Sequence, residues 1–214
     1  MASIYDLKPR FQALLRPATS WLAVRGVTAN QVTLAAVGLS LATGALVAAA
    51  PASRAVLLSV PVVLFVRMAL NAVDGMLARE HGMKTRLGAL LNELGDVVSD
   101  AGLYLPLALV PGVSAIGVTL VVLLGIVSEM AGVVAIQIGA DRRYDGPFGK
   151  SDRAFVFGCV FFLIGCGVET GNWVNIVLGI MAVLAAATIV NRSRRALQIA
   201  AGTAAGNTDE QRTN

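Results

Sequence analysis

The sequence predicts an all-α integral membrane protein, with six transmembrane helices that follow an N-terminal interfacial amphipathic helix. Three observations predict this fold class. The chain is rich in apolar residues, these are gathered in long runs with almost no charge, and most Lys and Arg residues flank the runs on one side. Continuous runs of Ala, Leu, Val and Gly suit packed membrane helices rather than the short alternating segments of a transmembrane barrel.

The composition excludes several classes of protein. Of the 214 residues, 56% are hydrophobic and 14% are charged, and the mean hydropathy is +0.73. An ordinary soluble domain has roughly 25% charged residues, so a water-soluble globular domain is excluded. The apolar content excludes a disordered chain, and the presence of only two cysteines excludes a disulfide-bonded secreted domain.

The N-terminal segment, residues 1–25, mixes large apolar residues with Lys and Arg before the first long apolar run. This mixture is typical of a helix that lies in the membrane interface. The segment lacks the cleavage pattern of a signal peptide. Pro17 lies within it, and we expect this proline to interrupt the helix.

The next segment, residues 26–195, contains six apolar runs separated by Pro and Gly signals. A helix needs about 20 residues to cross a ~30 Å hydrocarbon core. The predicted spans are 31–50, 55–78, 88–110, 113–139, 155–170 and 173–191. Residues 196–214 are small and polar, and we expect them to form a disordered tail.

The distribution of Lys and Arg predicts the orientation in the membrane. With six spans, the basic residues of the loops and termini fall on one side, and only Arg54 falls on the other. Because short cytoplasmic loops are enriched in Lys and Arg, we expect both termini in the cytoplasm of a bacterial-type inner membrane. Anionic headgroups of the bilayer account for these residues, and no aromatic-interleaved face supports a nucleic-acid partner.

Charged residues inside the spans cost about 2.5–3.5 kcal/mol each at the membrane centre, so a group of them needs a reason. Helical periodicity puts the polar residues of the second span on one face and repeats those of the third span every four residues. Joining helices by hydrogen bonds is one explanation, but it leaves several carboxylates without neutralisation. Facing carboxylate and amide oxygens suit Mg²⁺ or Mn²⁺. The candidate metal ligands are Asn71, Asp74, Asn92, Glu93, Asp96 and Asp100. In the fourth span, Glu129 is expected to face Arg67 or the polar cavity.

Two segments carry a family resemblance. Residues 71–79 read NAVDGMLAR, and residues 88–96, after a spacer of eight, read GALLNELGD. They resemble the signature of the CDP-alcohol phosphotransferases (CDP-alcohol phosphatidyltransferases), D-x-x-D-G-x-x-A-R, about eight residues, then G-x-x-x-D-x-x-x-D. Residues 28–30, TAN, resemble a T-P-N found before the first span in that family. The positions in register are Asp74, Gly75, Ala78, Arg79, Gly88 and Asp96.

The resemblance implies a transferase of phospholipid biosynthesis that acts as a homodimer. Such an enzyme moves a phosphatidyl or other substituted phosphate group from CDP-diacylglycerol or a related CDP-alcohol to a small alcohol and releases CMP. It implies Mg²⁺ or Mn²⁺ at the donor's pyrophosphate and Asp96 as the general base. The implied donor-binding residues are Thr28, Asn30, Gly75, Ala78, Arg79 and Gly88. A basic loop would bind the acceptor through Lys150 and Arg153, with Arg142 and Arg143 in support. Its charges favour a phosphorylated alcohol. The positive-inside rule explains the same charges equally well.

The chain departs from the signature at Asn71 and Asn92, where the family has aspartate. Three interpretations stay open. Glu93 and Asp100 restore the charge of a two-metal site; the enzyme uses one metal or an altered donor; or the chain is a lipid- or nucleotide-binding relative without turnover. A shift of one helical turn would also give Asp96 and Asp100 the spacing of the last two acids. A small ion transporter is a weaker alternative, because no paired broken helices are present in the sequence.

Overall fold

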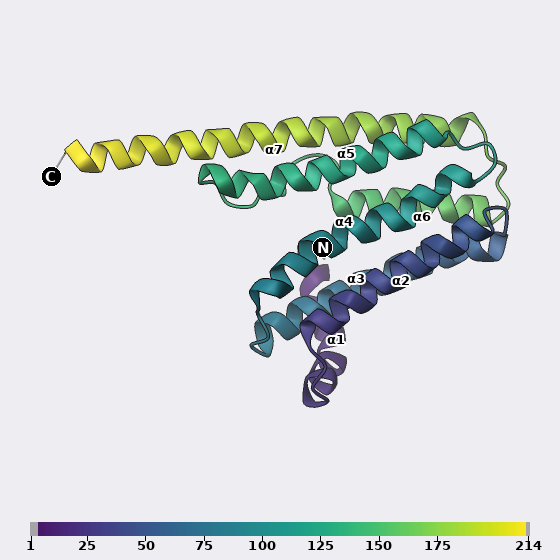
Figure 1. Ribbon diagram of the computed structural model, residues 1–214, viewed down its shortest axis with the longest axis horizontal. Coiled ribbons are helices and arrows are strands. Elements are labelled where there is room, and N and C mark those ends of the chain that lie inside the picture. Colours follow the sequence, from purple (N-terminus) through teal and green to yellow (C-terminus); the bar gives the residue numbers. More distant parts are fainter. Residues whose placement is uncertain (1–3, 213–214) are drawn as a thin grey trace. The chain divides into compact units, whose positions relative to one another are not determined.

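The protein, seen in a computed structural model (Figure 1), is described over residues 4–212, and that part of the chain is helical without strands. It divides into two compact units, one ending at Pro106 and one beginning at Leu107. The first unit contains α1 (Ile4–Val24), α2 (Ala29–Ala49), α3 (Arg54–Glu80) and α4 (Arg86–Tyr104). A short 3-10 helix, η1 (Leu105–Leu109), follows α4, and the second unit then contains α5 (Ala115–Val134), η2 (Ala135–Ile138), α6 (Lys150–Gly165) and α7 (Asn172–Arg212).

The helix boundaries follow from local capping residues. The Thr28 hydroxyl accepts a hydrogen bond from the backbone N–H of Gln31 at 3.3 Å, and the Gln31 side chain accepts one from the backbone N–H of Thr28 at 2.9 Å. This reciprocal pair satisfies two N–H groups that have no partner inside α2. Thr85 caps α4 by accepting a hydrogen bond from the backbone N–H of Gly88 at 2.8 Å.

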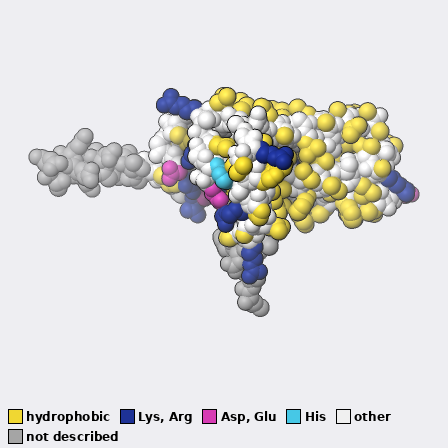
Figure 2. Space-filling model, turned by 90° about the horizontal axis from the view of Figure 1, so that it is seen from below, with side chains coloured by type: hydrophobic (Ala, Val, Ile, Leu, Met, Phe, Trp, Pro, Cys, Tyr) yellow, Lys and Arg dark blue, Asp and Glu magenta, His cyan; other side chains and the backbone are white. Residues whose placement is uncertain are grey.

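Four of the helical segments are long and apolar enough to cross a membrane: 29–49, 54–80, 115–138 and 172–201. Their side chains also place many apolar groups on the surface, as Figure 2 shows for one face of the molecule; Phe65, Ile116 and Val183 are examples that are more than half exposed. The predicted spans 88–110 and 155–170 correspond to α4, which carries four charged residues, and to α6, which has 16 residues. The count of six spans therefore stays a prediction.

Two expectations about the ends of the chain differ from the structure. Helix α1 is continuous through Pro17, so the predicted interruption there is wrong. Ala13 and Pro17 are both exposed, and the carbonyl that loses its partner to the proline therefore lies on an open face of the helix. Helix α7 runs to Arg212, where we predicted a disordered tail. Residues 196–212 contain several alanines, and extending an existing helix needs no new nucleus.

Helix α2 is the centre of the first unit, because it packs against both α3 and α4, while α1 packs against α3. Near the start of α2, Ala29 and Val32 form a buried apolar cluster with Val73 and Leu77 of α3, and apolar side chains of α1 cover this cluster. Arg16 of α1 also forms two hydrogen bonds of 3.1 Å with the Glu80 carboxylate at the end of α3. Because α2 packs against both α3 and α4, it holds these two helices, and with them their polar residues, in place.

We expect the substitution Gly44→Ala to destabilise the first unit. A Cβ atom at this position of α2 would overlap the backbone carbonyl oxygen of Gly102 in α4, and overpacking of this kind costs about 1–3 kcal/mol. The matched control is Gly38→Ala on the same helix, where a Cβ meets nothing within 4 Å; this change favours helix formation by up to about 1 kcal/mol. Thermal unfolding in detergent should therefore show a lower midpoint for Gly44→Ala than for the wild-type chain. The midpoint of Gly38→Ala should not fall.

In the second unit, α5 packs against α7, and the two lie side by side in Figure 1. The chain leaves η2 through Gly139, whose φ of +83° is a left-handed conformation that favours glycine. The loop between η2 and α6 returns along the same helices: the backbone N–H of Arg143 donates to the carbonyl of Gly132 at 3.1 Å. This loop carries Arg142, which lies near the buried Glu129.

Candidate functional site

The polar faces of α3 and α4 meet through side chains in the first unit. The Asn71 amide donates a hydrogen bond from Nδ2 to Oδ1 of Asp96 at 3.2 Å. Arg67 donates from Nη2 to the backbone carbonyl of Asp96 at 3.2 Å, and its Nη1 lies 2.6 Å from Oδ1 of Asp100. The two segments of the signature are therefore connected directly, as their helical spacing predicts.

Asp74 receives a hydrogen bond from α2. The Thr33 hydroxyl donates a hydrogen bond to Oδ2 of Asp74 at 2.8 Å, and Asp74 is 5% exposed. A buried carboxylate is costly unless it is hydrogen-bonded or paired, so Thr33 both satisfies and orients it. Sequence reasoning missed Thr33, because a single hydroxyl within an apolar run gives little signal. Asn92 and Glu93 are half-buried on α4, one turn before Asp96.

Arg67 and Asp100 form a buried ion pair, with whole-residue exposures of 3% and 8%. Removing one member of such a pair leaves the other charge uncompensated, which costs about 3–5 kcal/mol. We therefore expect Arg67→Met to lower the thermal unfolding midpoint strongly. The control is Arg67→Met combined with Asp100→Asn, which removes both charges and should recover a large part of the stability. Equal destabilisation in the single and double variants would contradict this account.

The residues predicted to bind the donor gather at two places in the first unit. A Cβ atom at Gly88 would lie 2.6 Å from Oδ1 of Asn30, so the Asn30 side chain approaches the first turn of α4 only because residue 88 is glycine. At Gly75 a Cβ would lie 2.9 Å from a terminal nitrogen of Arg79, which places the Arg79 side chain back over Gly75. The hydroxyl of Thr28 is used as the cap of α2.

The donor atoms around Asp96 suit a hard cation through carboxylate and amide oxygens. Among the residues that the structure describes, no three Asp, Glu, His or Cys side chains lie together as a metal site. A cation here would thus use Asp74 and Asp96 together with amide oxygens. Asn71 and Asp96 attract each other directly, whereas two carboxylates at 3.2 Å would repel each other without a cation between them. The residues present therefore fit a divalent ion, with fewer negative ligands than four aspartates would supply.

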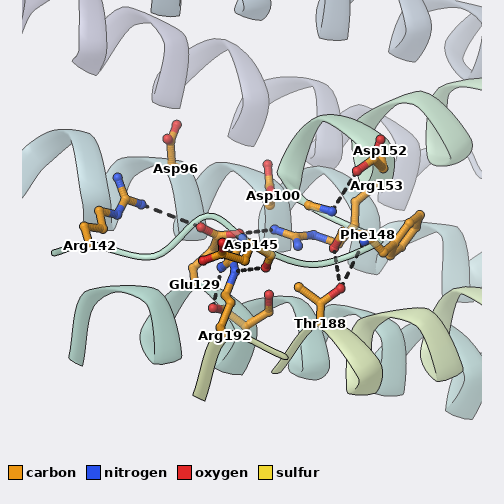
Figure 3. A network of polar contacts seen from close by, with 12 residues as sticks. Asp96, Asp100, Glu129, Arg142, Asp145, Phe148, Asp152, Arg153, Thr188 and Arg192 are labelled. Atoms are coloured by element: carbon orange, nitrogen blue, oxygen red, sulfur yellow. Dashed lines mark hydrogen bonds and ion pairs between the residues drawn. The ribbon is translucent and has the colours of Figure 1, made fainter. Parts of the chain in front are cut away.

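In the second unit, Glu129 of α5 binds three arginines (Figure 3). Its Oε1 lies 3.0 Å from Arg153 of α6 and 3.4 Å from Arg192 of α7, and its Oε2 lies 3.6 Å from Arg142. Of the two partners predicted for Glu129, Arg67 pairs with Asp100 in the first unit, and the expectation that Glu129 faces the polar cavity stays a prediction. We call Glu129, Arg142, Arg153 and Arg192 the arginine cluster. The sequence analysis missed Arg192, because it explained the basic residues after the last span only by the enrichment of Lys and Arg on the cytoplasmic side of a membrane.

The loop before α6 is fixed by further polar contacts. Arg143 donates two hydrogen bonds to the Asp145 carboxylate, at 2.7 and 2.8 Å, and Arg192 donates to the Asp145 backbone carbonyl at 3.2 Å. The Arg143 hydrogen bonds lower the pKa of Asp145 below its ordinary value of 3.8, so this carboxylate is ionised at neutral pH. The backbone N–H of Phe148 donates to the Thr188 hydroxyl at 3.0 Å (Figure 3).

The four predicted acceptor-binding residues differ in the contacts that they make, and their role in binding an acceptor stays a prediction. Arg142 and Arg153 contact Glu129, and Arg143 pairs with Asp145. Lys150 is half-buried as the first residue of α6. Next to it, Asp152 caps the helix by accepting a hydrogen bond from the backbone N–H of Gly149 at 2.7 Å.

Comparison with known proteins adds independent findings. Residues 26–191 match the model of a family described as CDP-alcohol phosphatidyltransferase. The chain is 47% identical over 199 residues to the inner membrane protein YnbA of Escherichia coli (strain K12), and the match covers 93% of this chain and 98% of that protein. Two similar solved structures are of the phosphatidylinositol phosphate synthase PgsA1 from Mycobacterium tuberculosis. The one with CDP-DAG bound has a TM-score of 0.72 at 20% identity and covers 84% of this chain and 92% of its own. The one in complex with manganese and citrate has a TM-score of 0.72 at 20% identity and covers 85% and 88%.

Proposed function

The chain belongs to the CDP-alcohol phosphatidyltransferase family, and from that membership we propose that it transfers a phosphatidyl or other substituted phosphate group from CDP-diacylglycerol or a related CDP-alcohol to a small alcohol, with release of CMP. The observation that carries the proposal is the hydrogen bond between Asn71 and Asp96, at 3.2 Å. It joins the two halves of the signature at the residues where the reaction would occur. PgsA1, which is similar in fold, has been crystallised with CDP-DAG.

Asp96 is the proposed general base. Its carboxylate is half-buried and held by Asn71, and its backbone carbonyl is held by Arg67. A positioned base takes the proton of the acceptor hydroxyl as that oxygen attacks the phosphorus, which contributes about 10²–10⁴ in rate. The bond between the phosphorus and the CMP oxygen breaks in the same displacement. Gly75 and Arg79, together with Gly88 and the Asn30 side chain beside it, would hold the nucleotide part of the donor.

A bound Mg²⁺ or Mn²⁺ would neutralise the pyrophosphate of the donor and assist the departure of CMP. We propose one cation, held by Asp74 and Asp96 with the amide oxygens of Asn71 and Asn92. Asp100 serves in this proposal as the counterion of Arg67, because the two side chains lie 2.6 Å apart. It therefore does not replace the charge that the two asparagines lack.

We further propose six membrane spans, with both termini and the active site on the cytoplasmic side of a bacterial-type inner membrane. The relative YnbA is named an inner membrane protein, and four segments of this chain are apolar and long enough to span. In this arrangement residues 1–25 lie in the interface, residues 26–195 form the catalytic domain, and two copies of the chain form a dimer.

A second candidate function is binding of a CDP-linked lipid without turnover. It is favoured by one observation: the Asn71 amide donates a hydrogen bond directly to Asp96, so no cation is needed to hold these two side chains together. Asparagine is also a weaker ligand for hard cations than aspartate, because it brings no negative charge.

Release of CMP separates the two functions. Purified protein in detergent would be given CDP-diacylglycerol, Mg²⁺ or Mn²⁺, and a panel of small alcohols, and the nucleotide and lipid products would be identified by mass spectrometry. The transferase should release CMP only with both a metal and an accepted alcohol. Binding of CDP-diacylglycerol with no CMP from any combination would establish the binding function instead.

A further inference from the structure

We propose that Glu129 is a built-in anion that fills the arginine cluster, so that this protein takes an acceptor alcohol without a phosphate or carboxylate group. The proposal rests on the transferase function proposed above and names the class of its acceptor. It reverses the expectation, based on the basic loop alone, that the acceptor is phosphorylated.

The contacts of Glu129 are those of a bound anion. Two guanidinium groups, of Arg153 and Arg192, approach Oε1, and a third, of Arg142, approaches Oε2, at distances between 3.0 and 3.6 Å. Arginine recognises carboxylate and phosphate oxygens with the same donor geometry. The carboxylate therefore occupies the position between three guanidinium groups at which an oxyanion of a substrate would otherwise bind.

Three of the four members of the cluster are buried, and Arg142 is half-buried, so solvent can screen their charges only weakly. Arg153 and Arg192 are each 2% exposed, and Glu129 is 9% exposed. Arg192 is fixed further, because it donates to the backbone carbonyls of Ser128 and Asp145. A phosphate that entered would compete with the Glu129 carboxylate for the same guanidinium groups and would meet its charge at close range, with little solvent between the two.

Helix α5 carries a glycine on each side of Glu129 that lets other parts of the second unit approach closely. Gly125 lies one turn before Glu129, and a Cβ there would come within 3.1 Å of Nε of Arg153. Gly132 lies nearly one turn after it, and a Cβ there would come within 2.5 Å of the backbone carbonyl oxygen of Arg143. Gly125 therefore makes room for the Arg153 guanidinium group, and Gly132 makes room for the loop that carries Arg142 and Arg143. This arrangement is a built site with its own anion rather than a chance pairing.

The first test is direct binding of inorganic phosphate. The wild-type chain, Glu129→Gln and the matched control Glu169→Gln, which changes an exposed residue outside the cluster, would be unfolded thermally in detergent at increasing phosphate concentrations. We expect phosphate to raise the unfolding midpoint of Glu129→Gln only, because a ligand that binds the folded state stabilises it. Equal stabilisation of the wild-type chain would overturn the proposal.

The second test is acceptor choice. CMP release would be compared for glycerol against glycerol 3-phosphate and for inositol against inositol 1-phosphate. We expect the wild-type chain to favour the neutral member of the accepted pair in kcat/KM, and Glu129→Gln to shift that ratio at least about tenfold towards the phosphorylated one. A wild-type preference for the phosphorylated acceptor would overturn the proposal. No CMP from any acceptor would instead contradict the transferase function, and the phosphate titration would still decide the role of Glu129.

A conservative variant keeps the test informative if Glu129→Gln does not fold. Glu129→Asp retains the negative charge on a shorter side chain. We expect it to behave as the wild-type chain does towards phosphate and towards the acceptor pairs. A phosphate response in Glu129→Asp as large as that expected for Glu129→Gln would contradict the role given to the charge.

Discussion

Asp96→Asn is expected to lower metal-dependent CMP release by at least about 100-fold while the protein stays folded. The loss follows from the role of a general base, which contributes about 10²–10⁴ in rate. The fold should tolerate the change for two reasons. An amide oxygen at position 96 can still accept the hydrogen bond from Asn71, and Arg67 keeps the backbone carbonyl of residue 96 and the Asp100 carboxylate while losing only the ion pair of 3.6 Å with Asp96. The measurement is CMP released per minute at saturating donor and acceptor, together with the thermal unfolding midpoint.

The matched control is Asp141→Asn, which removes the same charge from an exposed position in the loop before α6 and should leave CMP release unchanged. Asp100→Asn distinguishes the alternative register, in which Asp100 is the last acid of the signature. We expect this variant to lose stability, because buried Arg67 then loses its ion pair of 2.6 Å and keeps only the longer one of 3.6 Å with Asp96. A folded Asp96→Asn protein with full activity, beside an inactive but equally stable Asp100→Asn protein, would place the base at Asp100.

The helices and the polar face of the candidate site were predictable because they depend on local periodicity. Repetition of polar residues every three or four positions fixes which of them share a helix face, whatever the tertiary packing. The contact of Asn71 with Asp96 follows from that periodicity and a short connection between α3 and α4. Family membership was predictable for a similar reason, since Gly75, Arg79 and Gly88 stand at fixed spacings along the chain.

The choice of ion-pair partners was not predictable in the same way. Arg67 and Glu129 are both charged groups in apolar helices, and each must find an opposite charge. Which charge it finds depends on the packing of helices distant in sequence: Arg67 reaches α4, whereas Glu129 reaches α6 and α7. Spacing along one helix carries no information about this. The continuity of α1 through Pro17 has a similar origin, because it depends on the exposure of that face of the helix.

The two asparagines of the signature give the second large expected effect, which concerns the metal. Asn71→Asp should make the stability of the protein depend on a divalent cation. A carboxylate at position 71 would replace a hydrogen bond of 3.2 Å to Asp96 with repulsion between like charges. Loss of a fully buried hydrogen bond with an unsatisfied partner costs about 1–3 kcal/mol, and we expect the lower part of this range here because the bond is partly buried. For a chain of this length, each kcal/mol lowers the unfolding midpoint by roughly 2–4 °C.

In chelator, the Asn71→Asp protein should therefore unfold several degrees below the wild-type chain, and saturating Mn²⁺ should return it to the wild-type midpoint or above. Asn172→Asp is the matched control, because it adds the same charge at the exposed first residue of α7 and should leave the response to Mn²⁺ unchanged. If Asn71→Asp were no more sensitive to Mn²⁺ than the wild-type chain, no cation would lie between α3 and α4, and the single-metal site would be wrong. Agreement would mean that the asparagines let the two helices associate before the metal binds, whereas four aspartates would require the metal for that association.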